Sequence, residues 1–210
     1  MADNYLGRKM EEYEAQKCAS VRTRRVSLQS LLTKNRSTRG FDTSFKVRHD
    51  QLLSLVEAAR LAPSARNQQL LRYRLVTAEE AHLVLPHIKL GGALPELNLP
   101  LPDTEPNAFV VICCDKEGRY IDMDLGIAAQ TMLLRAVEMG LNGLCIAAFD
   151  REAITEKLSL PHTPQLLLAI GRSAERIEVV EVAEGESTTY YRENGTHFVP
   201  KIRIEDLIIK

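Results

Sequence analysis

A continuous apolar run, AFVVICC at residues 108–114, constrains the fold more than any other part of the sequence. Its β-branched members and unbroken apolar character predict a strand that is buried on both faces. GLCIAAF (143–149) and QLLLAIG (165–171) are runs of the same kind and predict two more buried strands. The strongest helix of the chain is expected from about Asp122 or Asp124 to Met139, because its apolar residues form a broad stripe. The sequence therefore predicts a core of buried strands packed against this helix.

The remaining segments predict helices and strands without regular alternation. Asp50 is expected to cap a helix that ends at Pro63. The buried face of that helix is expected to consist of Leu52, Leu53, Val56 and Ala59. Other expected elements are a charged helix at 3–18, strands at 71–77 and 177–183, a short helix at 78–88, a hairpin around Asn194-Gly195 and a last short helix at 204–210. This order is typical of the α+β class, with a main domain over 31–210 preceded by an N-terminal helix and extension over 1–30.

The composition excludes several classes of protein. The chain has 210 residues, 45% of them apolar, and 27 Lys and Arg nearly balance 28 Asp and Glu. That balance argues against a protein that coats nucleic acid or anionic lipid with its whole surface. No apolar run approaches the roughly 20 residues needed to cross a bilayer, and the N-terminus is charged where a secretory signal needs an apolar stretch. We therefore expect a cytoplasmic protein with neither nucleic-acid nor membrane partners.

The cysteines and histidines do not follow a metal-binding pattern. None of the four cysteines forms a CxxC pair, and the five histidines include no HExxH. Cys113, Cys114 and Cys145 have apolar neighbours, so they are expected to be reduced and buried. No metal site is expected.

Positive charge is concentrated between Ser20 and Arg48, where eight basic residues accompany a single acidic one. Such a patch on a nearly neutral protein suits a discrete anionic ligand, although a solvated surface strip has the same composition. Within it, Arg36 and Arg39 flank two hydroxyl side chains, and guanidinium and hydroxyl groups together suit phosphate oxygens. Lys201 and Arg203 occupy alternate residues of a predicted strand and would point to the same side. The two clusters could clamp one phosphate, although alternating surface charges are also common.

Two further segments could contact a flat ligand. After Pro63, the polar and small residues 64–68 precede a strand, and their side chains and backbone amides could read the edge of a planar heterocycle. A turn would have the same composition. Residues 143–148 are mostly small, so a ring could approach the backbone there, or the small side chains could simply pack against neighbours.

These segments, in this order, resemble the FMN-dependent nitroreductase family. Residues matching its RRSxRxF-like opening are Arg36, Ser37, Thr38, Arg39 and Phe41, and those matching its APSxxNxQPW element are Ala62, Pro63, Ser64, Ala65, Asn67 and Gln69. The long helix and the strand that follows it, together with VPKIRIEDLI at the end, complete the resemblance over Leu31–Lys210. The resemblance implies an α+β fold, with a mixed sheet flanked by helices, in an intertwined homodimer with FMN at the subunit interface.

The resemblance also implies roles for individual residues. Arg36, Ser37, Lys201 and Arg203 would hold the FMN phosphate and ribityl chain, and Thr38 belongs to the same motif. Arg39 would lie near the pyrimidine edge of the ring, whereas Cys145, Ile146, Ala147 and Ala148 would run along it. Pro63, Ser64, Ala65 and Asn67, with Gln69 of the same motif, would come from the other subunit. The flavin itself would accept hydride from NAD(P)H and pass it to a nitroaromatic, a quinone or a similar small acceptor, so no catalytic side chain is expected.

The sequence departs from the family pattern at three places. Asn35 replaces the first Arg of RRSxR, Leu70 and Leu71 replace the Pro-Trp of NxQPW, and Ala147 stands where some branches have Glu or Gly. Lys89 and Asn98 are possible substrate contacts. A flavin-modifying or dehalogenating enzyme, or a non-catalytic flavin-binding protein, are the alternatives on the same fold.

Overall fold

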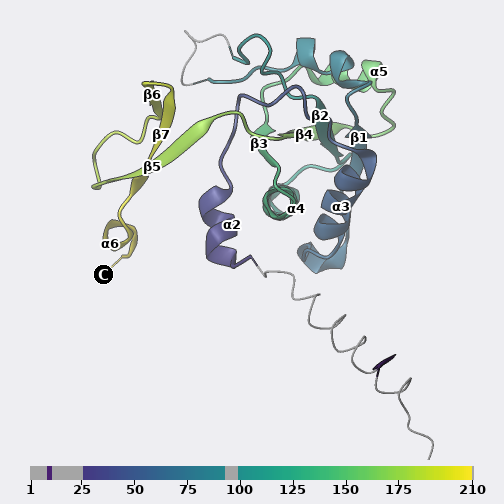
Figure 1. Cartoon of the computed structure of the whole chain (residues 1–210). Coiled ribbons are helices and arrows are strands. Elements are labelled where there is room, and N and C mark those ends of the chain that lie inside the picture. Colours follow the sequence, from purple (N-terminus) through teal and green to yellow (C-terminus); the bar gives the residue numbers. More distant parts are fainter. Residues whose placement is uncertain (1–8, 11–25, 93–98, 210) are drawn as a thin grey trace, which may run out of the picture.

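The computed structural model of the chain describes residues 9–10, 26–92 and 99–209. Most of the expected helix at 3–18 and of the N-terminal extension, together with Asn98, lies outside the described residues. Figure 1 shows a main body built on one sheet and a small C-terminal sheet set to one side of it. Helices and strands thus mix without regular alternation, and the α+β prediction is confirmed.

The main sheet has four strands in the order β1-β2-β4-β3, and every neighbouring pair is antiparallel. Its strands are β1 (Arg72–Val76), β2 (Ala108–Cys113), β3 (Asn142–Ile146) and β4 (Pro164–Gly171). All six residues of β2 are buried, as the unbroken apolar run predicts, because the sheet is covered on both faces. Expected strand 143–149 is shorter in the structure, since β3 ends at Ile146.

Two helices cover one face of this sheet. They are α3 (His49–Arg60) and α4 (Arg119–Glu138), which pack on the even-numbered residues of β2. The opposite face packs against α5 (Arg151–Lys157) and the single-turn 3₁₀ helices η2 (Ala81–Leu83) and η3 (Leu85–His87). The expected helix at 78–88 is therefore wrong: Pro86 cannot donate an N–H, and the segment forms only these short turns.

Details of the two large helices differ from expectation. Asp50 does not cap α3: it lies in the first turn, where its carboxylate pairs with the Arg48 guanidinium at 2.9 Å. Leu53 is 54% exposed and Leu55 is buried in its place, so the buried face is turned from the one expected. Helix α4 begins at Arg119, earlier than expected, and Asp124 lies buried within it.

The C-terminal sheet has the order β5-β7-β6. Strand β5 (Arg176–Val182) runs parallel to β7 (Thr196–Ile202), and β6 (Tyr191–Glu193) runs antiparallel to β7 in a hairpin through Asn194-Gly195, as predicted. The chain then enters α6 (Ile204–Leu207). Helix α2 (Leu28–Lys34) lies between this sheet and α4 (Figure 1). Residues of α2, α4 and β7 line a common cavity between the two parts of the fold. Among the described helices, none has both the length and the apolar character required to span a membrane.

Candidate functional site

A cavity of about 450 Å³ lies where α2, α4, β3 and β7 meet, and we call it the cationic cavity. The residues that line it are Leu32, Asn35, Arg36, Ser37, Arg39, Gln130, Leu133, Gly143, Cys145, Tyr190, His197, Val199 and Lys201. Three of them are basic, and none of these described lining residues is Asp or Glu. Ser37 and Lys201, 164 positions apart by their numbering, share this hollow. The electrostatics of the cavity favour an anionic ligand.

The segment after α2 is held on the edge of β3. Ser37 forms a parallel bridge with Gly143, and the Thr38 N–H donates to the Gly143 carbonyl at 3.2 Å. The Asn142 side chain accepts from the Arg36 N–H at 3.3 Å and donates to the Lys34 carbonyl at 2.9 Å. These contacts fix the backbone that carries two of the three basic side chains of the cavity.

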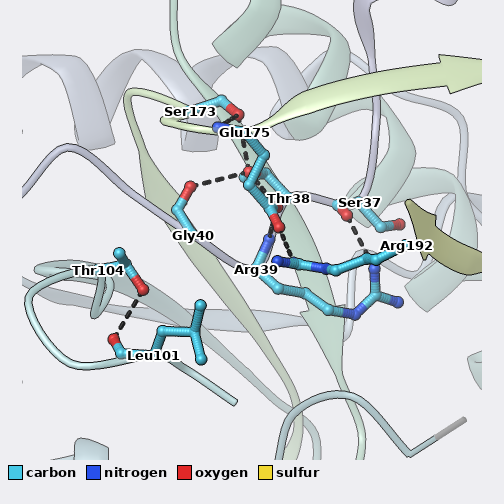
Figure 2. A network of polar contacts seen from close by, with 9 residues as sticks. All are labelled: Ser37, Thr38, Arg39, Gly40, Leu101, Thr104, Ser173, Glu175 and Arg192. Atoms are coloured by element: carbon cyan, nitrogen blue, oxygen red, sulfur yellow. Dashed lines mark hydrogen bonds and ion pairs between the residues drawn. The ribbon is translucent and has the colours of Figure 1, made fainter. Parts of the chain in front are cut away.

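A polar network buttresses the same segment from the other side (Figure 2). The Glu175 carboxylate accepts from the Thr38 hydroxyl at 3.0 Å, from the Arg39 N–H at 2.5 Å and from the Arg192 guanidinium. Thr38 is fully buried, and its hydroxyl also lies 2.8 Å from that of Ser173. Thr38 therefore braces the loop internally and does not line the cavity.

Arg36 and Arg39 sit differently in the cavity. The Arg36 guanidinium donates to the Leu32 carbonyl at 2.7 Å, while its Nε is buried with no hydrogen-bond partner. Burial also lowers the pKa of Arg36 from its ordinary value. The Arg39 guanidinium lies 4.6 Å from the centre of the Tyr190 ring and donates to the Ser37 carbonyl at 3.0 Å. Arg36 thus keeps a buried N–H donor that no group of the described chain satisfies, beside a cavity whose charge favours an anionic ligand.

Strand β7 contributes one face to the cavity. His197, Val199 and Lys201 occupy alternate positions and all three line it, as the period of a strand requires. Lys201 and Arg203 are not alternate residues of one strand as expected, because β7 ends at Ile202 and Arg203 is the N-cap residue of α6. Arg203 is exposed and is not among the lining residues.

The residues of β3 and the following turn are divided between core and cavity. Cys145 is exposed and lines the cavity, so the expectation that it is buried is wrong. Its neighbours Leu144 and Ile146 point into the core, since successive strand residues face opposite sides. Ala147 and Ala148 are exposed beyond the end of β3, and the Ala148 carbonyl accepts from the Lys89 N–H at 2.9 Å. Of the four residues expected to run along the ring, Cys145, Ile146, Ala147 and Ala148, only Cys145 lines the cavity.

Pro63 and the segment after it do not border the cationic cavity. Pro63, Ser64 and Gln69 line a separate cavity of about 190 Å³. The Ala65 N–H donates to the buried Asp124 carboxylate at 2.8 Å, while Asn67 is exposed and has a positive φ of 54°. None of these five residues lines the cationic cavity of the same chain.

Sequence reasoning did not identify His197 or Tyr190 as site residues. His197 is 2% exposed, and neither ring nitrogen has a hydrogen-bond partner. Burial and the nearby Arg39 charge lower the pKa of His197. The strand period that places Lys201 would also have placed His197 on the same face, because the two are four residues apart.

Comparisons with known proteins agree with this architecture. The model of the nitroreductase family matches residues 32–111 and 94–172. A nitroreductase family protein of Streptococcus pneumoniae TIGR4 superposes with a TM-score of 0.63 at 18% identity, covering 88% of this chain and all of that one. An FMN-dependent nitroreductase of Clostridium difficile R20291 gives a TM-score of 0.55 at 26% identity, covering 71% of this chain and 89% of that one.

Two more relatives extend these likenesses. The FMN and NADPH-dependent nitroreductase NfnB of Sphigopyxis sp. strain HMH has a TM-score of 0.58 at 20% identity, covering 71% of this chain and 89% of that one. A curated protein of Methanocaldococcus jannaschii, named as a nitroreductase, is 36% identical over 61 residues, 29% of this chain. The chain spans about a third of the length of that relative, 31%.

Proposed function

Since the chain belongs to the nitroreductase family, we propose that it is an FMN-dependent oxidoreductase that uses NAD(P)H. Its acceptor would be a nitroaromatic, a quinone or a similar small molecule. One observation carries this proposal above the others: a cavity lined by three basic residues and no acidic one, in which the Arg36 Nε lacks a partner. The FMN-dependent and NADPH-dependent proteins that share the fold support the choice of ligand.

The residues present fit a flavin mononucleotide. Arg36, Ser37 and Lys201 would hold the phosphate, because together they supply charge and hydroxyl donors at one cavity. The cavity volume of about 450 Å³ is within the range of small-molecule and cofactor sites. Cys145 and Gly143 of β3 would border the bound molecule on another side.

The chain's own contribution would be binding and orientation. The bound flavin would supply hydride transfer between the nicotinamide and the acceptor. Asn142 and Glu175 would hold the 36–39 segment in place before the cofactor arrives, so less ordering is needed on binding. Besides Ser37 and the basic residues, Asn35, Gln130, Tyr190 and His197 are polar side chains of the cavity lining that would orient a ligand by hydrogen bonds.

We also propose that the active form is a homodimer. Pro63, Ser64, Ala65, Asn67 and Gln69 do not reach the cationic cavity of their own chain, so their family role requires a second copy. Exposed apolar side chains on α2 and α4, such as Leu28 (62% exposed) and Ile127 (40% exposed), offer surface for this contact. Leu70 and Leu71, in place of the family's Pro-Trp, would make the wall from that subunit aliphatic.

An absorbance spectrum of the purified chain tests the proposal. We expect a yellow protein whose flavin absorbance bleaches when NADH or NADPH is added without oxygen and returns with an acceptor. Parallel lines in two-substrate kinetics would then support alternating reduction and reoxidation. A yellow protein that neither nucleotide bleaches would indicate a flavin carrier without reductase activity, and a chain that takes up no FMN would contradict the proposal.

A further inference from the structure

His197 is the residue of the cationic cavity whose polar groups are least accounted for. It is 2% exposed, lies on the cavity wall, and leaves both ring nitrogens without a hydrogen-bond partner. Two buried, unpaired nitrogens cost folding free energy unless something else satisfies them. The two nitrogens are closed to solvent, so a ligand in the cavity would satisfy them after a small movement of the ring.

The position of His197 along β7 indicates which part of a ligand it would meet. It lies four residues before Lys201 on the same face of the strand. Because a strand rises about 3.3 Å per residue, the Cα atoms of the two residues are about 13 Å apart. Arg39 and His197 also line a smaller neighbouring cavity of about 140 Å³. Arg39 and His197 therefore lie where the two cavities adjoin.

Burial and the charges around His197 together lower its pKa and so favour the neutral ring. Arg192 is its directly paired neighbour on β6, Arg39 approaches from the loop after α2, and Glu175 precedes β5. Burial is the largest cause that lowers the pKa of His197, followed by Arg39, while Glu175 opposes the shift and Arg192 adds to it. The centre of the Tyr190 ring lies 5.1 Å from the centre of the His197 ring. A neutral imidazole has one donor and one acceptor nitrogen.

We infer that the His197 imidazole binds the flavin ring. It would form hydrogen bonds with a polar edge of that ring, about four residues along β7 from Lys201. This inference rests on the proposed function. One donor and one acceptor match a heterocycle edge that carries carbonyl and N–H groups, whereas the phosphomonoester of FMN is mostly a dianion at pH 7 and offers mainly acceptors. His197 would thus orient the ring while Lys201 anchors the phosphate.

Three probes separate these two roles: FMN, riboflavin, which lacks the phosphate, and inorganic phosphate, used as a competitor. In His197→Gln, we expect the affinities for FMN and riboflavin to fall by the same factor, about ten-fold, and the affinity for phosphate to stay unchanged. In Lys201→Ala, FMN and phosphate should bind more weakly and riboflavin as before. His82→Gln, an exposed histidine outside the cavity, is the matched control.

Because His197 is buried, its replacement could disturb folding, so a second variant, His197→Asn, is tested beside His197→Gln. A separate measurement uses the wild-type chain: the imidazole ¹⁵N resonances of His197 should shift when riboflavin is added and not when phosphate is added. Unchanged flavin affinity in folded His197 variants, or resonances that respond to phosphate alone, would overturn the inference and leave the proposed function intact. A wild-type chain that binds no flavin would overturn both.

Discussion

Asn142 and Arg36, 106 residues apart in sequence, are joined by a hydrogen bond of 3.3 Å from the Arg36 N–H to the Asn142 side-chain oxygen. The same oxygen accepts from the Gly143 N–H at 3.0 Å, and the amide nitrogen donates to the Lys34 carbonyl at 2.9 Å. One side chain thus ties the end of α2 to β3. We predict that Asn142→Ala lowers the free energy of unfolding by about 1–3 kcal/mol and weakens FMN binding, because Arg36 loses its fixed backbone.

Gln165→Ala is the control for this prediction. The Gln165 side chain also bonds to a backbone carbonyl, that of Cys114 at 2.8 Å, but it lies outside the cationic cavity. Its loss should reduce stability without changing FMN affinity. Urea denaturation and flavin fluorescence titration measure the two quantities. Equal FMN affinity in wild type and Asn142→Ala would show that the hydrogen bonds do not position Arg36.

Gly143 is required by packing within the sheet. A Cβ placed on it would lie 2.2 Å from the Ala169 carbonyl oxygen of β4, and backbone cannot move aside as a flexible side chain can. We predict that Gly143→Ala lowers the free energy of unfolding by about 1–3 kcal/mol. Gly126 also lies within a secondary-structure element, helix α4, but a Cβ placed on it would have no heavy atom within 4 Å. Gly126→Ala should therefore raise stability by about 0.5–1 kcal/mol, and denaturant midpoints that rank the two variants otherwise would contradict this account.

The buried strands could be predicted from the sequence because their signal is local. Ala108–Cys113 and, beyond Gln165, residues 166–171 are apolar along their length, and that alone identifies strands covered on both faces. The strand order, in contrast, depends on contacts between distant segments that no local pattern encodes. Cys145 has apolar neighbours like the buried cysteines, yet it is exposed because β3 is an edge strand whose alternate residues face the cavity.

The candidate site shows the same division. Arg36, Ser37, Arg39 and Lys201 could be found from residue type and spacing, and they share one cavity in the structure. The strand period would also have placed His197 on the face of Lys201, but its lack of hydrogen-bond partners is visible only in three dimensions. Asp50 has the residue type of a helix cap, but the adjacent Arg48 guanidinium binds its carboxylate. Whether the Asp50 carboxylate caps the helix or pairs with Arg48 depends on side-chain geometry, which the sequence does not give.

Lys201 and Arg203 are alike in charge and close in sequence, but they differ in position. Lys201 lines the cationic cavity, whereas Arg203 lies beyond the end of β7. We predict that Lys201→Ala weakens FMN binding ten-fold or more, equivalent to about 1.5–3 kcal/mol for a hydrogen bond to a charged group. Arg203→Ala should change it little. Fluorescence titration at two salt concentrations checks this, and a larger loss in Arg203→Ala would place the phosphate nearer to α6.

Cys145 offers a test that needs no activity. Of the three cysteines in the described part of the chain, it alone is exposed, and desolvation of its thiol raises its pKa. Because the thiolate is the reactive form, alkylation should still accelerate with pH above about 8.5, the usual thiol pKa. In a Cys18→Ser background, we expect one reactive thiol in the native chain and slower labelling when FMN is bound, since Cys145 lines the cavity.

Cys113 and a Cys145→Ser variant provide the contrast for this measurement. Cys113 is buried, and desolvation, with smaller contributions from Asp115 and Cys114, raises its pKa to about 11. It should therefore react only when the chain unfolds, so Cys145→Ser, made in the same Cys18→Ser background, should take up almost no reagent in native buffer. Mass spectrometry of the labelled peptides identifies the site. FMN that leaves the rate at Cys145 unchanged would mean that the flavin does not lie against β3, because a ring packed there would shield the sulfur from reagent.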